Sequence, residues 1–283
     1  MLSSGFLAGC KGRLFLSLQH NSARQTAAAC AGAVVILPPF AEEMNKSRHL
    51  LANLMRQLAA NGYDSFLLDN YGTGDSEGDL DLTTADIWRT DLQQLLQRIA
   101  QCGYQQLSFV AVRFGSLQLF DLLNHYPLPL TLQQLVLWQP WFDTAKFWQQ
   151  FARIKLAQSL ASNDKLTLAD LTQQLNVGTD IEIAGYPINA TFYTSLMQLQ
   201  SQFPAVLTNT PVHWFNSTTT TTVAPAVQQH AAALSQQCQL KLVHLPCQPY
   251  WQATELVQAP ELISQTAALF SQQQDVGGRQ QHG

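Results

Sequence analysis

Short apolar runs alternate with amphipathic segments along most of the chain, which is the pattern of β-strands alternating with α-helices. The pattern predicts strands at 33–37, 65–68, 107–112, 135–138, 212–215 and 240–243, after shorter strand-like pieces around 13–18. It predicts helices at about 45–61, 87–103, 116–125 and 259–270, the first capped by Asn45 or Ser47. Repeated strand-helix-strand units of this length predict a mostly parallel central sheet with helices on both faces.

The strand rhythm stops between 141 and about 205, where helical periodicity takes over with one short extended piece near 181–183. We therefore expect an inserted helical cap over about 141–205. The cap would belong to a single domain covering 1–273, because 283 residues are few for two domains with linkers. The polar tail at 274–283 is expected to be disordered.

The charge and cysteine content of the chain exclude some classes of binding partner. Charged residues make up 12% of the chain and the net charge is −4, without a basic stripe, so nucleic acid is not an expected partner. The five cysteines are scattered without a C-x-x-C pair, which predicts reduced thiols in a cytoplasmic protein and no metal site. No run approaches the roughly 20 apolar residues of a membrane span. No cofactor is expected either.

Two stretches carry a resemblance to known proteins. The loop 69–78, DNYGTGDSEG, resembles the D-x-x-G-x-G-x-S-x-G segment of α/β-hydrolases. The block 38–48, PPFAEEMNKSR, is similar to the signature of the exosortase A system-associated hydrolases, type 2. The likeness to that family extends to 112–117, 147–157, 184–186 and 249–252.

The resemblance implies an α/β-hydrolase fold with an inserted helical cap. It also implies genes near the exosortase and PEP-CTERM sorting machinery, often beside exopolysaccharide genes. It implies no particular substrate, because one fold hosts many functions.

The nucleophile of an α/β-hydrolase stands on a tight turn between a strand and a helix. The only segment with that context is 111–115, where Arg113 occupies the nucleophile position. A guanidinium stays protonated at working pH and is no nucleophile. Ser116 lies about one turn into the helix; it is either a displaced nucleophile or, in the interpretation we favour, a helix-packing residue.

The acid and the base of a triad also lack their usual occupants. No Asp or Glu occurs between Glu182 and Glu255, which leaves Asn216 at the position after the strand 212–215. Asp143 is an alternative acid, although capping the following helix is the favoured interpretation. The loop 245–255 before the last helix contains no histidine, and His244 belongs to the strand. We predict that the standard Ser-acid-His triad is absent.

Arg113 has three interpretations that the sequence leaves open. If Glu42 or Glu43 turns inward, either would form a desolvated ion pair with Arg113 that shifts a carboxylate pKa or fixes the loops. Arg113 and Lys46 could instead bind an anionic ligand group, or Arg113 could only brace neighbouring loops. The expected pocket comprises Phe40, Ala41, Lys46, Phe114, Asn216, Tyr250 and Trp251.

Three functions follow from these expectations. The favoured one is a ligand-binding or weakly active member of the hydrolase fold, linked to an exosortase or exopolysaccharide system. The alternative is an active hydrolase or acyltransferase on an ester or thioester, using Arg113 with Glu42 or Glu43. A third is an interaction subunit with an apolar patch on the cap, drawn from Trp138, Trp141, Phe142, Phe147, Trp148 and Phe151. The expected ligand is a small anionic or acyl-containing molecule, and a homodimer is left open.

Overall fold

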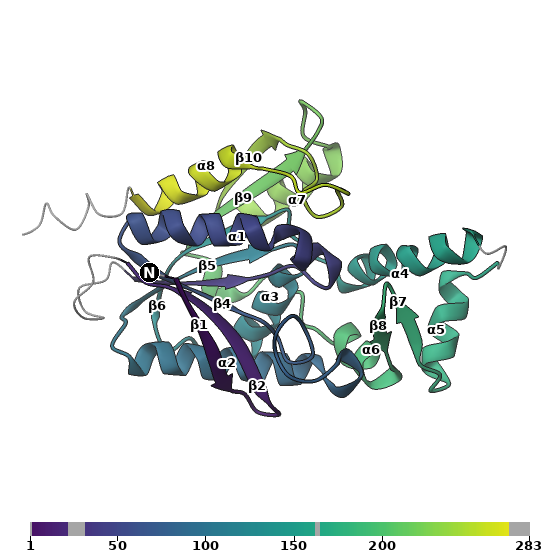
Figure 1. Ribbon diagram of the computed structural model, residues 1–283. Helices are drawn as coiled ribbons and strands as arrows, with labels where there is room; N and C mark the ends of the chain where they lie inside the picture. The colour runs from purple at the N-terminus through teal and green to yellow at the C-terminus, as the bar shows by residue number, and fades with distance from the viewer. Residues whose placement is uncertain (1, 22–31, 162–164, 272–283) are drawn as a thin grey trace, which may run out of the picture.

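A single eight-stranded sheet forms the centre of the molecule (Figure 1). The computed structural model describes residues 2–21, 32–161 and 165–271 of the 283-residue chain. The strands are β1 (Leu2–Ala8), β2 (Arg13–Gln19), β3 (Gly32–Leu37), β4 (Tyr63–Leu68), β5 (Gln106–Val112), β6 (Thr131–Trp138), β9 (Pro211–Thr218) and β10 (Gln239–Pro246). Their order is β1-β2-β4-β3-β5-β6-β9-β10. The pairs from β4 to β10 are parallel, whereas β1 and β2 run antiparallel, so the mostly parallel sheet is confirmed.

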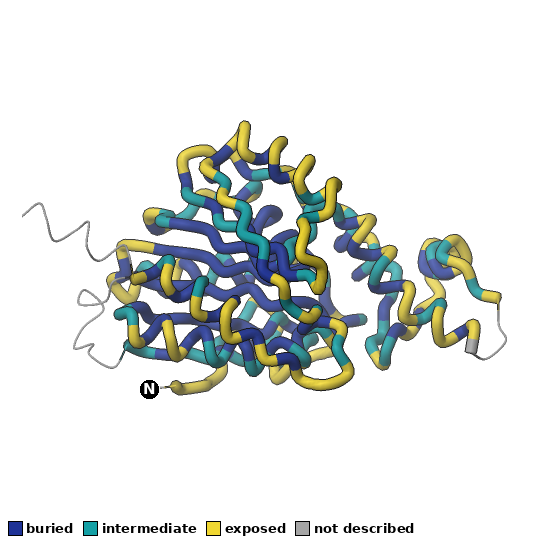
Figure 2. Tube along the Cα trace, turned by 90° about the horizontal axis from the view of Figure 1, so that it is seen from above, coloured by how far each residue is buried: buried dark blue, intermediate teal, exposed yellow. Residues whose placement is uncertain are grey.

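Helices cover both faces of the sheet because successive strand residues point to opposite sides. On β3, Val34 and Ile36 pack with α1 (Glu42–Ala60) and α8 (Pro260–Ser271). Val35 and Leu37 face the other way, toward the cluster that includes α2 (Ala85–Gln101), α3 (Gly115–His125) and α7 (Pro225–Ser235). Figure 2 shows the dark-blue buried strands enclosed by helices whose outer sides are yellow. This two-sided burial explains why the central strands read as continuous apolar runs.

The segment between β6 and β9 stands to one side of the sheet (Figure 1). It contains α4 (Thr144–Ala161), α5 (Leu168–Asn176), β7 (Ile181–Ile183), β8 (Tyr186–Ile188), α6 (Ala190–Met197) and a short 3-10 helix, η3 (Ala205–Leu207). The extended piece expected near 181–183 is a two-stranded antiparallel hairpin, because a lone strand would leave its backbone groups unpaired. Ala184 and Gly185 form its turn with φ angles of 54° and 84°, as two-residue hairpin turns require.

Several element boundaries differ from those expected. The first helix begins at Glu42 rather than after Asn45 or Ser47, because Ala41 (φ 53°, ψ −130°) turns the chain into the helix without a side-chain cap. Glu42 and Glu43 lie in the first turn of this helix, where the positive end of the helix dipole stabilises their negative charges. β6 begins at Thr131, and α7 was not expected because its buried face has only Ala231 and Leu234. The tail 274–283 lies outside the described residues.

Candidate functional site

The turn between β5 and α3 keeps a strained backbone. Arg113 lies directly after β5 with a φ of 52°, in the left-handed region that side chains other than glycine rarely adopt. Gly115 begins α3, and a Cβ there would stand 2.3 Å from the carbonyl oxygen of Leu37 on β3. A glycine is therefore needed where the elbow crosses the end of β3. The turn has the geometry that displays a nucleophile in hydrolases of this architecture, with an arginine at its apex.

Glu43, and not Glu42, turns inward to Arg113. Nε of Arg113 donates to Oε2 of Glu43 at 3.1 Å, and Nη2 donates to Oε1 at 2.9 Å. The side chains are 6% and 22% exposed, so the pair is largely removed from solvent. Such a fork-to-fork pair binds both carboxylate oxygens and neutralises the guanidinium. Nη1 reaches the carbonyl oxygen of Gln139 at 3.5 Å.

Two tryptophans flank the guanidinium of Arg113. Its Cζ atom lies 4.8 Å from the ring centroid of Trp141 and 4.6 Å from that of Trp251. Both distances are within the range of cation–π attraction. Trp141 leads into α4, and Trp251 lies in the loop between β10 and α8, where a triad histidine would stand. Arg113 thus joins four segments: α1, the elbow, the entry to the cap segment and the loop before α8.

Ser116 is a packing residue in this structure. Its Oγ lies 2.7 Å from the carbonyl oxygen of Arg113 and 2.6 Å from that of Trp141, and it accepts the N–H of Trp141 at 2.9 Å. The residue is fully buried. A hydroxyl held by three backbone groups and closed to solvent is not displayed as a nucleophile.

The other triad candidates serve local roles. Nδ2 of Asn216 lies 3.1 Å from Nδ1 of His244, its partner across β9 and β10. Nε2 of His244 reaches the carbonyl oxygen of Thr220 at 2.9 Å, so both ring nitrogens are engaged. Oδ1 of Asp143 accepts the N–H of Lys146 at 3.0 Å, which is the capping role that the sequence favours for Asp143.

A cavity of about 290 Å³ opens beside the Arg113 pair, between the sheet end and α4. Its lining residues are Phe40, Ala41, Glu42, Glu43, Lys46, Trp141, Phe147, Gln150, Phe151, Ile154, Ala184, Trp251 and Gln252. Most of the lining residues are apolar, and five of the thirteen are aromatic. Lys46 stands among them with Nζ 3.3 Å from the carbonyl oxygen of Gln252. Lys46 forms no ion pair with a described carboxylate. The cavity therefore combines an apolar interior with one cation that lacks an acidic partner.

Glu42 occupies the side of the cavity away from Arg113. Its Oε1 accepts from Nδ2 of Asn45 at 3.1 Å and from the hydroxyl of Tyr186 at 3.2 Å. Burial, followed by the nearby charge of Glu42, raises the pKa of Tyr186 to about 12, so the phenol stays protonated and donates. These contacts link α1 to the β7–β8 hairpin.

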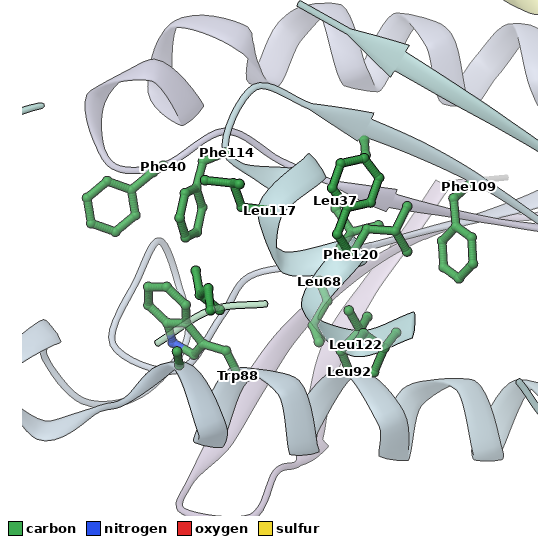
Figure 3. Close-up of a cluster of buried hydrophobic side chains, with 14 of the residues drawn as sticks. Leu37, Phe40, Leu68, Trp88, Leu92, Phe109, Phe114, Leu117, Phe120 and Leu122 are labelled. Atoms are coloured by element: carbon green, nitrogen blue, oxygen red, sulfur yellow. The ribbon is translucent and has the colours of Figure 1, made fainter. Parts of the chain in front are cut away.

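Four of the seven expected pocket residues line the cavity, namely Phe40, Ala41, Lys46 and Trp251. Phe114, Asn216 and Tyr250 are not among the lining residues, and all three are buried. Phe114 fills an aromatic cluster, with ring centroids 5.3 Å from Phe40 and 4.6 Å from Phe147; Figure 3 shows its ring beside those of Phe40 and Trp88. Tyr250 packs against Trp138 at 6.2 Å. Asn216 is turned to His244, as described above.

One face of α4 lines the cavity and was not expected there, although its residue spacing signals it. Phe147, Gln150, Phe151 and Ile154 follow the i, i+3, i+4, i+7 spacing of one helix face. Of the six residues expected to form an apolar patch on the cap, Trp138, Phe147, Trp148 and Phe151 are buried, and Trp141 and Phe142 are half-buried. No cluster of three or more metal-ligating side chains occurs within the part of the chain that the structure describes. Nor does any helix in that part have the length and hydropathy to cross a membrane.

The parallel sheet, the crossing helices and the strained elbow define the chain as an α/β-hydrolase fold. Sequence comparison gives the family within that class. The family model described as serine aminopeptidase, S33, matches residues 28–245, and the chain belongs to this family. No curated protein sequence matches the chain.

Solved structures of hydrolases share the fold over nearly the whole chain. Est1E from Butyrivibrio proteoclasticus with bound ferulic acid aligns at a TM-score of 0.65 with 13% identity, covering 96% of this chain and 98% of Est1E. A soluble variant of monoglyceride lipase from Saccharomyces cerevisiae aligns at 0.62 with 14% identity, covering 97% and 95%. Proline iminopeptidase from Mycobacterium smegmatis aligns at 0.58 with 11% identity, covering 97% and 100%. At these identities the likeness shows the fold alone.

Proposed function

We propose that this chain is a non-catalytic member of its hydrolase family that binds a small ligand in the cavity beside α4. The observation that carries the proposal is the Arg113 side chain at the elbow, paired with both oxygens of Glu43 and covered by Trp141 and Trp251. Acyl transfer by this fold needs a nucleophile at that point, with a histidine to take its proton and an acid to orient the histidine. In this chain, Arg113 stands at the position of the nucleophile, Trp251 at that of the histidine and Asn216 at that of the acid. None of the three can perform the role of its position.

An unorthodox hydrolase is the alternative, with Glu43 activating water and Arg113 holding the oxyanion. A general base needs a carboxylate oxygen free to accept a proton from water. Both oxygens of Glu43 already accept hydrogen bonds from the same guanidinium. Glu42 is closer to solvent, but its hydrogen bonds hold it toward Asn45 and Tyr186. The geometry therefore favours binding over catalysis.

The cavity lining defines the chemistry of the ligand. Its aromatic walls favour an acyl chain or an aryl group, and a volume of about 290 Å³ holds roughly ten methylene-sized groups. Lys46 can pair with a carboxylate or phosphate at the mouth. Arg113 contributes little to anion binding, because Glu43 already neutralises it. We therefore place the anionic head group of the ligand at Lys46 rather than at Arg113.

The test is a panel of short- and medium-chain esters and thioesters, assayed with wild type, Arg113→Ala and Glu43→Ala, with folding checked by thermal melts. We expect no turnover by any of the three proteins. A parallel thermal-shift screen with medium-chain fatty acids and aryl carboxylates should raise the melting temperature of wild type, with a smaller rise for Lys46→Ala. Turnover by wild type that is lost in Arg113→Ala or Glu43→Ala would refute the proposal and establish the alternative.

We further propose that the protein acts in the cytoplasm beside an exosortase, PEP-CTERM or exopolysaccharide system. The support is the likeness of 38–48 to the exosortase-associated family, together with four free cysteines among the described residues, Cys10, Cys102, Cys238 and Cys247. Deleting the gene should change the surface display of PEP-CTERM proteins or the secreted polysaccharide. Unchanged display and polysaccharide in the deletion strain would remove the link.

A further inference from the structure

The outer edge of β1 is one of the two edges of the sheet. β1 and β10 are the two edge strands, and no described residue pairs with β1 on the side away from β2 (Figure 1). Figure 2 shows the strand beside the N-terminus as an exposed run at the margin of the molecule. An edge of this kind presents unpaired N–H and C=O groups that can pair with another strand.

Hydrogen bonds on the neighbouring strands fix which β1 groups point outward. The carbonyl oxygen of Phe15 on β2 accepts from the N–H of Asp69 at 2.9 Å, so Phe15 directs its backbone groups away from β1. Phe6 is the antiparallel partner of Phe15, so Phe6 is not hydrogen-bonded to β2. By alternation, Leu2 and Ser4 likewise direct their N–H and C=O groups outward. The carbonyl of Ala8 also points outward, but Nη2 of Arg98 already donates to it at 2.7 Å.

Exposed apolar side chains accompany these free backbone groups. Leu2 is 49% exposed and Phe6 is 52% exposed, and both lie on the same face of β1 because they are four residues apart. Phe6 also packs edge-on against Phe15, with ring centroids 5.6 Å apart. The two exposed side chains therefore lie symmetrically on either side of Ser4.

The opposite edge of the sheet is protected and β1 is not. β10 carries an exposed lysine, Lys241, and ends at an exposed proline, Pro246, both of which discourage pairing with another strand. The sequence of β1, LSSGFLA, contains neither a charge nor a proline. A sheet that protects one edge and leaves the other apolar is suited to association through the unprotected edge.

We propose that β1 pairs antiparallel with β1 of a second copy of this chain, about a two-fold axis at Ser4. In that register Leu2 of each copy faces Phe6 of the other, and Ser4 faces its own symmetry mate. The residues with outward backbone groups, Leu2, Ser4 and Phe6, then exchange about six hydrogen bonds. The strand is its own complement, as a two-fold interface requires, so no second kind of partner is needed. The proposal does not depend on the ligand site.

Sedimentation velocity over low to high micromolar concentrations tests the proposal. Wild type should dimerise, whereas Ser4→Lys and Ser4→Glu should each raise the dimer dissociation constant at least tenfold, because each places like charges opposite one another on the axis. An equimolar mixture of the two variants should restore a dimer, since opposite charges then face each other. Ala157→Lys, on the exposed side of α4, is the matched control and should dimerise like wild type.

Restored dimerisation in the mixture also shows that both variants are folded. A wild type that stays monomeric at all concentrations would overturn the proposal. So would a dimer that persists in both Ser4 variants, because association would then use another surface. Open-ended oligomers of wild type would contradict a closed two-fold pairing.

Discussion

Arg113 is buried at a turn where hydrolases of this class display their nucleophile, and its neighbours are matched to a cation rather than to a nucleophile. Glu43 supplies the opposite charge, and Trp141 and Trp251 supply the two ring faces. A buried ion pair is weak evidence for stability when compared with an apolar replacement, but removing one partner leaves the other charge buried. The contribution of Arg113 to the free energy of unfolding therefore depends on Glu43, and substitution of Glu43 measures this dependence.

Glu43→Ala should lower the free energy of unfolding by about 2–4 kcal/mol, because it leaves Arg113 buried without its carboxylate. Glu42→Ala is the matched control on the same helical turn. It removes an exposed carboxylate with two hydrogen bonds and should cost less than about 1 kcal/mol. Urea denaturation of the three proteins gives the comparison. If both variants lose the same free energy of unfolding, the ion pair of Arg113 and Glu43 contributes no more to stability than the hydrogen bonds of Glu42.

Asp91 provides a second prediction, on pH dependence. Burial raises the pKa of Asp91 above its ordinary value, while the N–H of Cys10, which donates to Oδ1 at 2.7 Å, and the charge of Arg98 lower it. An acid whose pKa is raised on folding destabilises the fold once the pH exceeds the pKa of the unfolded chain, about 4 for Asp. Asp91→Asn keeps the acceptor for Cys10 and removes the charge.

Asp91→Asn should therefore be more stable than wild type at neutral pH, and the difference should narrow as the pH falls toward 4. Urea denaturation at several pH values measures it. A variant that is less stable than wild type at pH 7 but equal to it at pH 4 would mean that the charged form is the stabilising one.

At the scale of the elements, the elbow depends on how closely α3 approaches the end of β3. Gly115→Ala would put a Cβ 2.3 Å from the carbonyl oxygen of Leu37, a backbone atom that cannot move by a rotamer change. We expect a loss of about 1–3 kcal/mol or more in the free energy of unfolding. Gly5→Ala on β1 is the control, since nothing lies within 4 Å of its Cβ, and it should be neutral. A neutral Gly115→Ala would show that β3 and α3 shift apart at little cost.

Local periodicity predicted the elements whose burial is regular and missed the others. The central strands and α2, α3 and α8 were expected because each has a continuous or periodic apolar pattern. The start of α1 depends on the backbone of Ala41, which no residue preference signals. β8 has only three residues and is defined by its pairing with β7, so its own pattern is too short to predict it.

Part of the candidate site was also predictable from the sequence. Arg113 and its carboxylate partner were expected from the loop positions of this fold, although the choice between Glu42 and Glu43 depends on where α1 begins. The flanking tryptophans come from segments far apart along the chain, and Trp251 was expected to line a pocket rather than to cover a guanidinium. Phe114, Asn216 and Tyr250 were misplaced because proximity to the elbow in sequence does not say which side of the turn a side chain faces.

At the scale of the whole molecule, the sheet and its two helical layers form an α/β-hydrolase fold, and residues of the segment between β6 and β9 line a cavity beside the elbow. Within this fold, Arg113 stands at the apex of the elbow. Aromatic side chains and Lys46 line this cavity. We therefore predict that the protein binds its ligand without forming a covalent intermediate.

Intact mass spectrometry after incubation with a fluorophosphonate probe tests whether the protein carries an activated serine, because such probes phosphonylate the activated serine of serine hydrolases. We predict that wild type keeps its unmodified mass, with an active serine hydrolase of the same fold labelled in parallel. Stoichiometric addition of one phosphonyl group to the folded wild type, at Ser116 or any other serine, would show an activated nucleophile and contradict the account.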